Sequence, residues 1–450
     1  MTMSNRFPLH QDNIAPADPL THRYILQEKN IITILFKPYY EWSFRWNDSL
    51  RNSSGLKTTY RGWYVDIGPV VGNADKIWTI SLNEESPKTP LLMLHGLGAG
   101  VAMWVMNLDS LATHRPVYAI DVLGFGRSSR PAFSSDAKLV EMQLVNSVEE
   151  WRKEMNIDKF ILLGHSMGGF LAASYSMQHP GRVKHLILAD PWGFPERPAN
   201  VAERYQLPLW VRAVVAVVAP LNPLWALRAA GPLGQWVVEK ARPDLVRKFA
   251  PVVPDAGVII PQYIHQCNSQ SPSGESAFHA LMSGFGWAKN PIINRIDHIR
   301  DDIPITLIFG SRSWVDNVTG DIIKKHRPNS SFVNVQIING AGHHVYLDKP
   351  EIFNKYVGEA CQYTERAPPP VNPTDETESD QECDQTNPQS PPHPKTVETR
   401  INSETVTLDR DCKISMQDSF HISKTIRSII SFPFWLKEKY ICLHERKRDI

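Results

Sequence analysis

The sequence predicts an α/β fold in which a mostly parallel β-sheet carries helices on both faces. Six short runs are mainly apolar, and segments of helical character separate them. A strand of that composition is typical of a sheet that is buried on both faces. The runs cover residues 91–94, 117–120, 160–163, 185–189, 305–309 and 333–338.

Composition divides the 450-residue chain into segments around this sheet. Residues 61–363 have the composition of one folded domain. Between about 195 and 290 the alternation stops and prolines and tryptophans accumulate, which predicts an inserted helical cap over the carboxyl edge of the sheet. Residues 1–60 form a polar extension with an aromatic cluster, 364–412 a disordered acidic and proline-rich linker, and 413–450 a basic tail.

Charge and cysteine usage exclude several classes of function. The formal net charge of +1 gives no reason to expect a nucleic-acid partner. Five cysteines without paired short spacings indicate neither a disulfide framework nor a zinc site. No signal sequence and no apolar run of spanning length is present, so we expect a cytoplasmic protein that is not integral to the membrane.

The stretch GHSMGG (164–169) places Ser166 in a sharp turn between an apolar run and a helical segment. Strand, turn and helix in this order are the context of a nucleophile elbow, in which the serine hydroxyl is lifted clear of the sheet. Gly164 and Gly168 are expected to be glycines because a Cβ would collide with the neighbouring strand or helix. The pattern therefore predicts that Ser166 is a nucleophile, held in an α/β-hydrolase fold.

A serine nucleophile needs a base and an acid that orients the base. The segment INGAGHHVYLDKP (338–350) follows the last predicted strand, and we predict His343 as the base and its neighbour His344 as a bystander. For the acid we favour Asp316, in the loop after the run 305–309. Asp190, at the end of the run 185–189, is the alternative.

The tetrahedral oxyanion of acyl transfer needs backbone N–H donors. One is expected from Met167, which follows the nucleophile. The other is expected from Leu97, in the glycine-rich stretch LHGLGAG (94–100) that follows the first predicted strand. These residues complete the predicted oxyanion hole.

Five stretches together resemble the α/β-hydrolase domain-containing proteins 4 and 5: HGLGAG, DVLGFGRSSRP, GHSMGG, DPWGFPERP and GAGHHVYLD. The resemblance covers about 60–363 and implies lipid substrates, among them N-acyl phosphatidylethanolamines and their lyso forms, and triacylglycerol handling at lipid droplets. One branch of the family has asparagine in place of the nucleophile and acts as a lipase co-activator. Ser166 places this sequence with the catalytically competent branch.

The family pattern His-x-x-x-x-Asp is met by His343 and Asp348. In the family it is the proposed basis of lysophosphatidic acid acyltransferase activity. The stretch Asp-Lys-Pro-Glu from Asp348 also has the form of a helix capping box. We favour a helix cap for Asp348 over a part in acyl transfer.

The resulting hypothesis is a serine hydrolase of acyl lipids that works through an acyl-enzyme and needs no metal or organic cofactor. Two alternatives stay open: a lysophosphatidic acid acyltransferase, and a non-catalytic co-activator of a partner lipase at lipid droplets. In the tail, isoleucines share one helical face beside lysines and arginines, which predicts peripheral contact with a membrane or lipid-droplet surface. The aromatic residues of the extension are a second candidate contact: Tyr39, Tyr40, Trp42, Phe44 and Trp46.

Overall fold

The computed structural model describes residues 58–198, 224–283 and 286–366. Nearly all of the predicted N-terminal extension and linker, the whole basic tail and residues 199–223 of the predicted cap lie outside these ranges. The candidate lipid contacts of the extension and tail therefore stay predictions.

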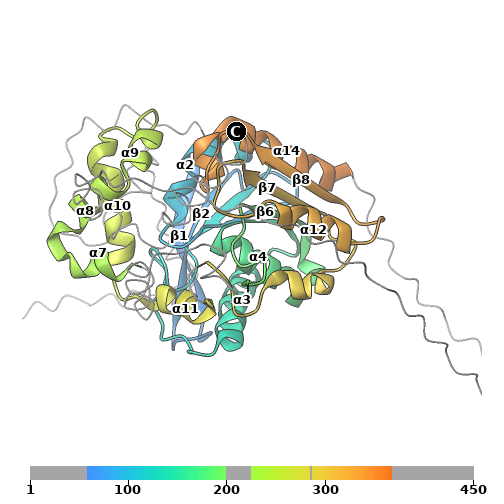
Figure 1. The fold of residues 1–450 in the computed structure, drawn as a ribbon, viewed down its shortest axis with the longest axis horizontal. Coiled ribbons are helices and arrows are strands. Elements are labelled where there is room, and N and C mark those ends of the chain that lie inside the picture. Colours follow the sequence, from blue (N-terminus) through green and yellow to red (C-terminus); the bar gives the residue numbers. More distant parts are fainter. Residues whose placement is uncertain (1–57, 199–223, 284–285, 367–450) are drawn as a thin grey trace, which may run out of the picture. The chain divides into compact units, whose positions relative to one another are not determined.

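Within the described ranges, eight strands form one sheet in the order β1-β2-β4-β3-β5-β6-β7-β8 (Figure 1). Neighbours from β4 to β8 pair in parallel, whereas β2 is antiparallel to both β1 and β4. The strands are β1 (Tyr60–Gly68), β2 (Asp75–Leu82), β3 (Leu91–Leu94), β4 (Val117–Ile120), β5 (Phe160–His165), β6 (Val183–Ala189), β7 (Ile305–Gly310) and β8 (Val333–Ile338).

The predicted α/β class is confirmed, and each of the six apolar runs coincides with one of the strands β3 to β8. The runs are mainly apolar because neighbouring residues lie on opposite, covered faces of the sheet. The edge strand β8 departs from this, since it contains Asn334 and Gln336 and is only partly buried. On β5, Ile161 and Leu163 belong to one hydrophobic core, and Phe160 and Leu162 belong to the other. Strands β1 and β2 were not predicted. On β1 buried and more exposed positions alternate, as on a strand with one covered face, so it contains no apolar run.

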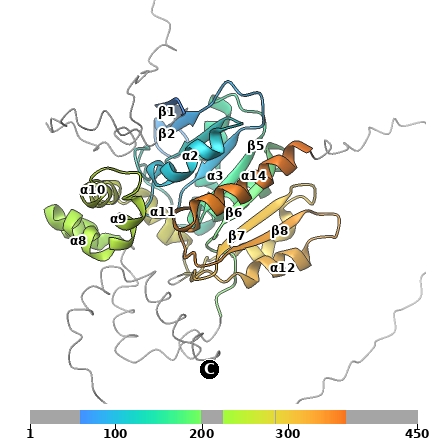
Figure 2. The same cartoon turned by 90° about the horizontal axis from the view of Figure 1, so that it is seen from above.

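Helices cover the sheet on both faces (Figure 2). Residues of α2, α13 and α14 pack in one core around Trp104, whose ring centroid lies 4.2 Å from that of Tyr346. Residues of α3, α4 and α12 pack in the other. These helices are α2 (Val105–Ala112), α3 (Ala137–Glu154), α4 (Met167–Gln178), α12 (Val318–His326), α13 (Val345–Asp348) and α14 (Pro350–Arg366). Short 3-10 turns are Val101–Trp104, Pro180–Arg182, Gly231–Leu233 and Ile292–His298.

Residues 224–283, the described part of the predicted cap, are mainly helical. Leu245 of α9 and Ile260 of α10 bury their side chains in the core around Trp104, and α11 packs on α3. The helices are α7 (Trp225–Ala229), α8 (Gly234–Ala241), α9 (Pro243–Phe249), α10 (Ala256–Ser269) and α11 (Ser273–Leu281). In the part of the chain that the structure describes, no helix has the length and apolar character needed to cross a bilayer.

Candidate active site

Ser166 occupies the sharp turn between β5 and α4. Its φ of 54° is rare for a residue with a side chain and marks a strained backbone. The flanking glycines allow the turn: a Cβ on Gly164 would lie 2.1 Å from the carbonyl oxygen of Gly168, and one on Gly168 would lie 2.4 Å from that of Leu94. No side chain fits at either position, as the sequence predicted.

His343 lies beside this serine. Its Nε2 is 3.0 Å from Ser166 Oγ, so the neutral ring accepts a hydrogen bond from the hydroxyl. The loop that carries it leaves β8 through Gly340, whose φ is +77°. Its backbone is also fixed, because Nε2–H of buried His165 donates to the carbonyl oxygen of His343 over 2.9 Å. His344 lines the same pocket, but the structure places His343 and not His344 next to the serine.

The acid beside His343 is Asp190, and the prediction of Asp316 is corrected. Asp190 Oδ2 lies 2.5 Å from His343 Nδ1, whereas Asp316 is exposed and accepts a hydrogen bond from the N–H of Val318, two residues ahead, over 3.0 Å. The reason is the path of the loop after β7. In that loop the hydroxyl of Ser313 points to Asp190, whereas Asp316 accepts from the N–H of Val318, the first residue of α12.

Asp190 is fully buried and held by several donors. Its backbone N–H donates to Ile308 across the β6–β7 edge over 2.8 Å. Its carboxylate accepts from the N–H of Gly310 over 3.2 Å and from the hydroxyl of Ser313. Burial raises the pKa of the Asp190 carboxyl well above its ordinary value, and these two donors act in the opposite direction. The donors therefore stabilise the ionised form that orients His343.

Ser313 and Trp314 are functional candidates that the sequence analysis missed. The ring of Trp314 lies 4.7 Å from that of His343 between centroids, on the pocket side of the imidazole. Both follow a buried strand, which is the signal that could have found them, but serine and tryptophan carry no charge pattern that distinguishes them from an ordinary loop.

Two more histidines flank the site: His165 is buried, and His344 is partly buried and lines the cavity. Burial lowers the pKa of His165 well below its ordinary value, and the neighbouring His343 acts in the same direction. Burial likewise lowers the pKa of His344, with smaller contributions from Arg242, His165, His343 and Lys248. Neither ring therefore competes for the proton that His343 must carry.

The predicted oxyanion donors lie at the expected elements. Met167 is the first residue of α4, where a backbone N–H has no partner within the helix. The loop of Leu97 approaches the elbow closely, since a Cβ on Gly96 would lie 3.1 Å from the Cβ of Ser166. Leu97 also lines the pocket. The geometry leaves Met167 and Leu97 as candidate donors.

Asp348 does not cap a helix, which corrects the favoured prediction. It is the last residue of α13, and its Oδ2 accepts from the N–H of Gly342, the residue before His343, over 2.7 Å. Its Oδ1 lies 2.6 Å from Nζ of Lys248 on α9. The carboxylate thus joins the histidine loop to the cap. Both of its oxygens are used in these two contacts and not in capping a helix.

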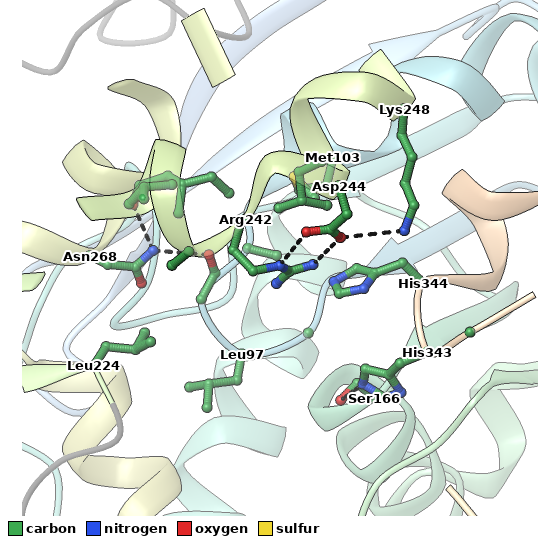
Figure 3. Close-up of a pocket in the computed structure, with 18 of the residues that line it drawn as sticks. Leu97, Met103, Ser166, Leu224, Arg242, Asp244, Lys248, Asn268, His343 and His344 are labelled. Atoms are coloured by element: carbon green, nitrogen blue, oxygen red, sulfur yellow. Dashed lines mark hydrogen bonds and ion pairs between the residues drawn. The ribbon is translucent and has the colours of Figure 1, made fainter. Parts of the chain in front are cut away.

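A cavity of about 530 Å³ opens onto Ser166 and His343 (Figure 3). Much of its cap side is apolar, from α7, α8, α9, α10 and the residue before α7: Leu224, Ala226, Leu227, Val238, Ala241, Leu245 and Ile264. A second part of the cap side is charged and carries Arg242, Asp244 and Lys248. Such a cavity accommodates an amphiphilic substrate with a reactive carbonyl near Ser166.

A serine on a strand-to-helix turn, a histidine after the last strand and a buried aspartate, hydrogen-bonded in that order, define the α/β-hydrolase class. A family profile described as alpha/beta hydrolase fold matches residues 89–350, and the chain belongs to this family. Within it, the chain belongs to the group of α/β-hydrolase domain-containing proteins 4 and 5, as the following similarities show.

The chain is 52% identical over 290 residues to the human (lyso)-N-acylphosphatidylethanolamine lipase, an alignment of 64% of this chain and 84% of the relative. It is 51% identical over 292 residues to the human 1-acylglycerol-3-phosphate O-acyltransferase ABHD5, covering 65% and 83%. Among solved structures, a membrane phospholipase A described as a bacterial virulence factor is similar with a TM-score of 0.50 and 24% identity, over 68% of this chain and 87% of that one. The last similarity concerns the fold alone.

Proposed function

We propose that the protein is a serine hydrolase of acyl lipids, of the phospholipase or lysophospholipase type, that works through an acyl-enzyme on Ser166. The observation that carries the proposal is the hydrogen-bonded series from Ser166 through His343 to Asp190 at the floor of a largely apolar cavity. The name of the lipase relative supports N-acyl phosphatidylethanolamine and its lyso form as substrates.

The distances support the following path for the protons. Nδ1–H of His343 donates to Asp190, so Nε2 accepts the proton of Ser166 as Oγ bonds to the acyl carbonyl carbon. The oxyanion that forms is stabilised by the N–H groups of Met167 and Leu97. His343 then gives its proton to the departing alcohol. A water molecule, deprotonated by the same Nε2, releases the fatty acid and restores the serine.

The test is a fluorophosphonate probe together with a panel of labelled lysophospholipids. The wild type should be labelled at Ser166, since an activated serine reacts readily with such a probe. Ser166→Ala should lose labelling and lipid hydrolysis together while keeping its thermal stability. Hydrolysis that survives in Ser166→Ala would refute the proposal.

Acyl transfer to a lysophospholipid is the second candidate, favoured by the name of the acyltransferase relative. Asp348 accepts a hydrogen bond from Gly342 and forms an ion pair with Lys248. Transfer through the acyl-enzyme therefore fits the site better than direct action of His343 and Asp348 on acyl-CoA. Supplying acyl-CoA and lysophosphatidic acid to Ser166→Ala distinguishes the two routes. Transfer that persists without Ser166 would favour the direct route.

Peripheral association with a membrane or lipid droplet, with a possible lipase partner there, completes the proposal. It rests on the charge and apolar pattern of residues 413–450 and on the aromatic cluster of the N-terminal extension. A chain ending at Arg366 should bind anionic vesicles more weakly than the full-length protein, and the difference should shrink at high salt. Equal binding of both chains would contradict a role for the tail, and undiminished stimulation of a partner lipase by Ser166→Ala would indicate a co-activator.

A further inference from the structure

Two kinds of surface meet in the cap side of the cavity. The apolar residues of α7, α8 and α10 form one part, and Arg242, Asp244 and Lys248 in and beside α9 form the other. In Figure 3 these three side chains form a connected row, with His344 between them and the pair of Ser166 and His343. A ligand whose carbonyl lies at Ser166 can therefore reach both surfaces.

The charged part of the wall is a network of four side chains. Arg242 donates from Nε and Nη2 to the two carboxylate oxygens of Asp244, over 3.0 and 2.9 Å. Lys248 Nζ lies 3.6 Å from Asp244 and 2.6 Å from Asp348. The side chains of Arg242 and Lys248 are 36% and 24% exposed. Two cations thus line the cavity, and the carboxylates of Asp244 and Asp348 balance their charge.

The two cations of this wall act on the histidine next to the catalytic base. Arg242 and Lys248 both act to lower the pKa of His344, in addition to the larger effect of burial. His344 is next to His343 in the chain, and its ring centroid lies 5.6 Å from that of His343. An anion bound to Arg242 and Lys248 would therefore lie in the same cavity as a carbonyl placed at Ser166.

We propose that Arg242 and Lys248 form a subsite for a phosphate ester, namely the phosphate of the head group of an acylated glycerophospholipid. This inference rests on the proposed function, which supplies the acyl chain and the scissile ester. A guanidinium presents paired donors that match two phosphate oxygens, and an ammonium adds a compact charge. The phosphate would take the place of the carboxylates of Asp244 and Asp348 as partner of the two cations.

This assignment predicts selectivity by head group. The apolar part of the cavity would bind the chain of any acyl lipid, whereas the charged part would distinguish a phosphate from a hydroxyl. Because the resident carboxylates compete with the phosphate, the gain should be moderate. We expect about a tenfold preference, the worth of one charge-assisted hydrogen bond.

The experiment compares two ether lipids that Ser166 cannot cleave: an alkyl glycerol phosphate and the matched alkyl glycerol. Each is titrated as a protectant of the full-length protein against fluorophosphonate labelling, and the ratio of the two protecting concentrations is the readout. Glycerol 3-phosphate forms a third arm, which distinguishes a lipid head group from a free phosphate ester. Effects common to both lipids, such as a shift of the histidine loop, cancel in the ratio.

In the wild type the phosphate lipid should protect at a concentration about tenfold below that of the neutral lipid. Arg242→Gln and Lys248→Gln should each bring the ratio close to one, and Arg242→Lys, which keeps the charge, should retain part of it. Arg247→Gln is the matched control. Arg247 lies on α9 next to Lys248, but it is exposed and does not line the cavity, so the ratio of protecting concentrations should stay at the wild-type value.

Unchanged ratios in Arg242→Gln and Lys248→Gln would overturn the subsite, as would an equal fall in Arg247→Gln, which would indicate general surface charge. Protection by glycerol 3-phosphate as strong as that by the phosphate lipid would overturn the lipid assignment. If the wild type were not labelled, the proposed hydrolase would fail separately. The same two lipids titrated by tryptophan fluorescence would still give the ratio without any reaction at Ser166.

Discussion

The two walls of the cavity hold their side chains in different ways. On the sheet side, the side chains of His343 and Asp190 are 8% and 0% exposed. On the cap side, those of Arg242 and Asp244 are 36% and 35% exposed. Asp190 is fixed by a backbone hydrogen bond to Ile308, and the backbone of His343 is held by the ring of His165. The charged cap residues are held by ion pairs.

This difference separates the two tasks of the site. Proton transfer requires atoms held within a fraction of an ångström, which rigid strand ends provide. Lipid selection tolerates adjustment, because half-exposed ion pairs can exchange partners at modest cost. Substitutions on the sheet wall should therefore change turnover strongly, and substitutions on the cap wall should change which lipid binds.

The largest effect is expected from the acid of the sheet wall. Asp190→Asn removes the carboxylate that orients His343 and favours the wrong tautomer of the imidazole, so kcat should fall by up to ~10⁴-fold. Asp316→Asn is the matched control at an exposed loop position and should keep nearly full activity. Steady-state hydrolysis of one lysophospholipid by both variants shows which aspartate is the acid. The reverse order of losses would restore Asp316 as the acid.

A smaller effect is expected at Asp348, where the two walls meet. Asp348→Ala leaves the N–H of Gly342 without its acceptor and loosens the loop of His343, so kcat and the rate of fluorophosphonate labelling should both fall about tenfold. Asp348→Asn keeps an acceptor for Gly342 but loses the ion pair with Lys248, and its loss should be only a few-fold. If Asp348→Asn abolished acyl transfer from acyl-CoA while labelling stayed normal, Asp348 would act directly on the acyl donor.

The smallest effect on turnover is expected at His185, whose ring nitrogens contact Thr364 and Thr306 and not the active site. Burial lowers the pKa of His185 to about 3 and that of His95 to about 4, below the unfolded value of 6.5. Between these values the unfolded chain binds protons that the folded chain does not, so the free energy of unfolding falls as pH drops below about 6.5. Each histidine contributes up to about 1.4 kcal/mol per pH unit in its window.

Urea unfolding at a series of pH values measures that slope. His185→Gln should make the slope shallower with little change in turnover at neutral pH. The cap wall behaves differently. Burial acts to raise the pKa of Asp244, but Arg242 outweighs it and brings the value to about 2, so this contribution is lost only as pH falls below about 3.8. A slope that did not respond to His185→Gln would contradict its buried, neutral state.

Local patterns in the sequence determined the sheet and the nucleophile. Strands β3 to β7 are mainly apolar because both faces of the sheet are covered, and that requirement can be read from each run alone. Gly164 and Gly168 likewise follow from the turn, since a Cβ at either position meets backbone at 2.1 or 2.4 Å. The role of His343 could be predicted because the glycine-rich loop after the last strand has few other residues that could act as a base.

The partners of His343 depended on the tertiary structure. Asp190 and Asp316 both follow buried strands, and only the path of the loop after β7 decides that Ser313 turns inward and Asp316 turns outward. Asp348 has the local pattern of a helix cap, yet Gly342 and Lys248 occupy its oxygens, and Lys248 is 100 residues away in the sequence. A sequence pattern specifies what one segment prefers, whereas a carboxylate takes its partner from whichever segments packing brings within hydrogen-bond distance.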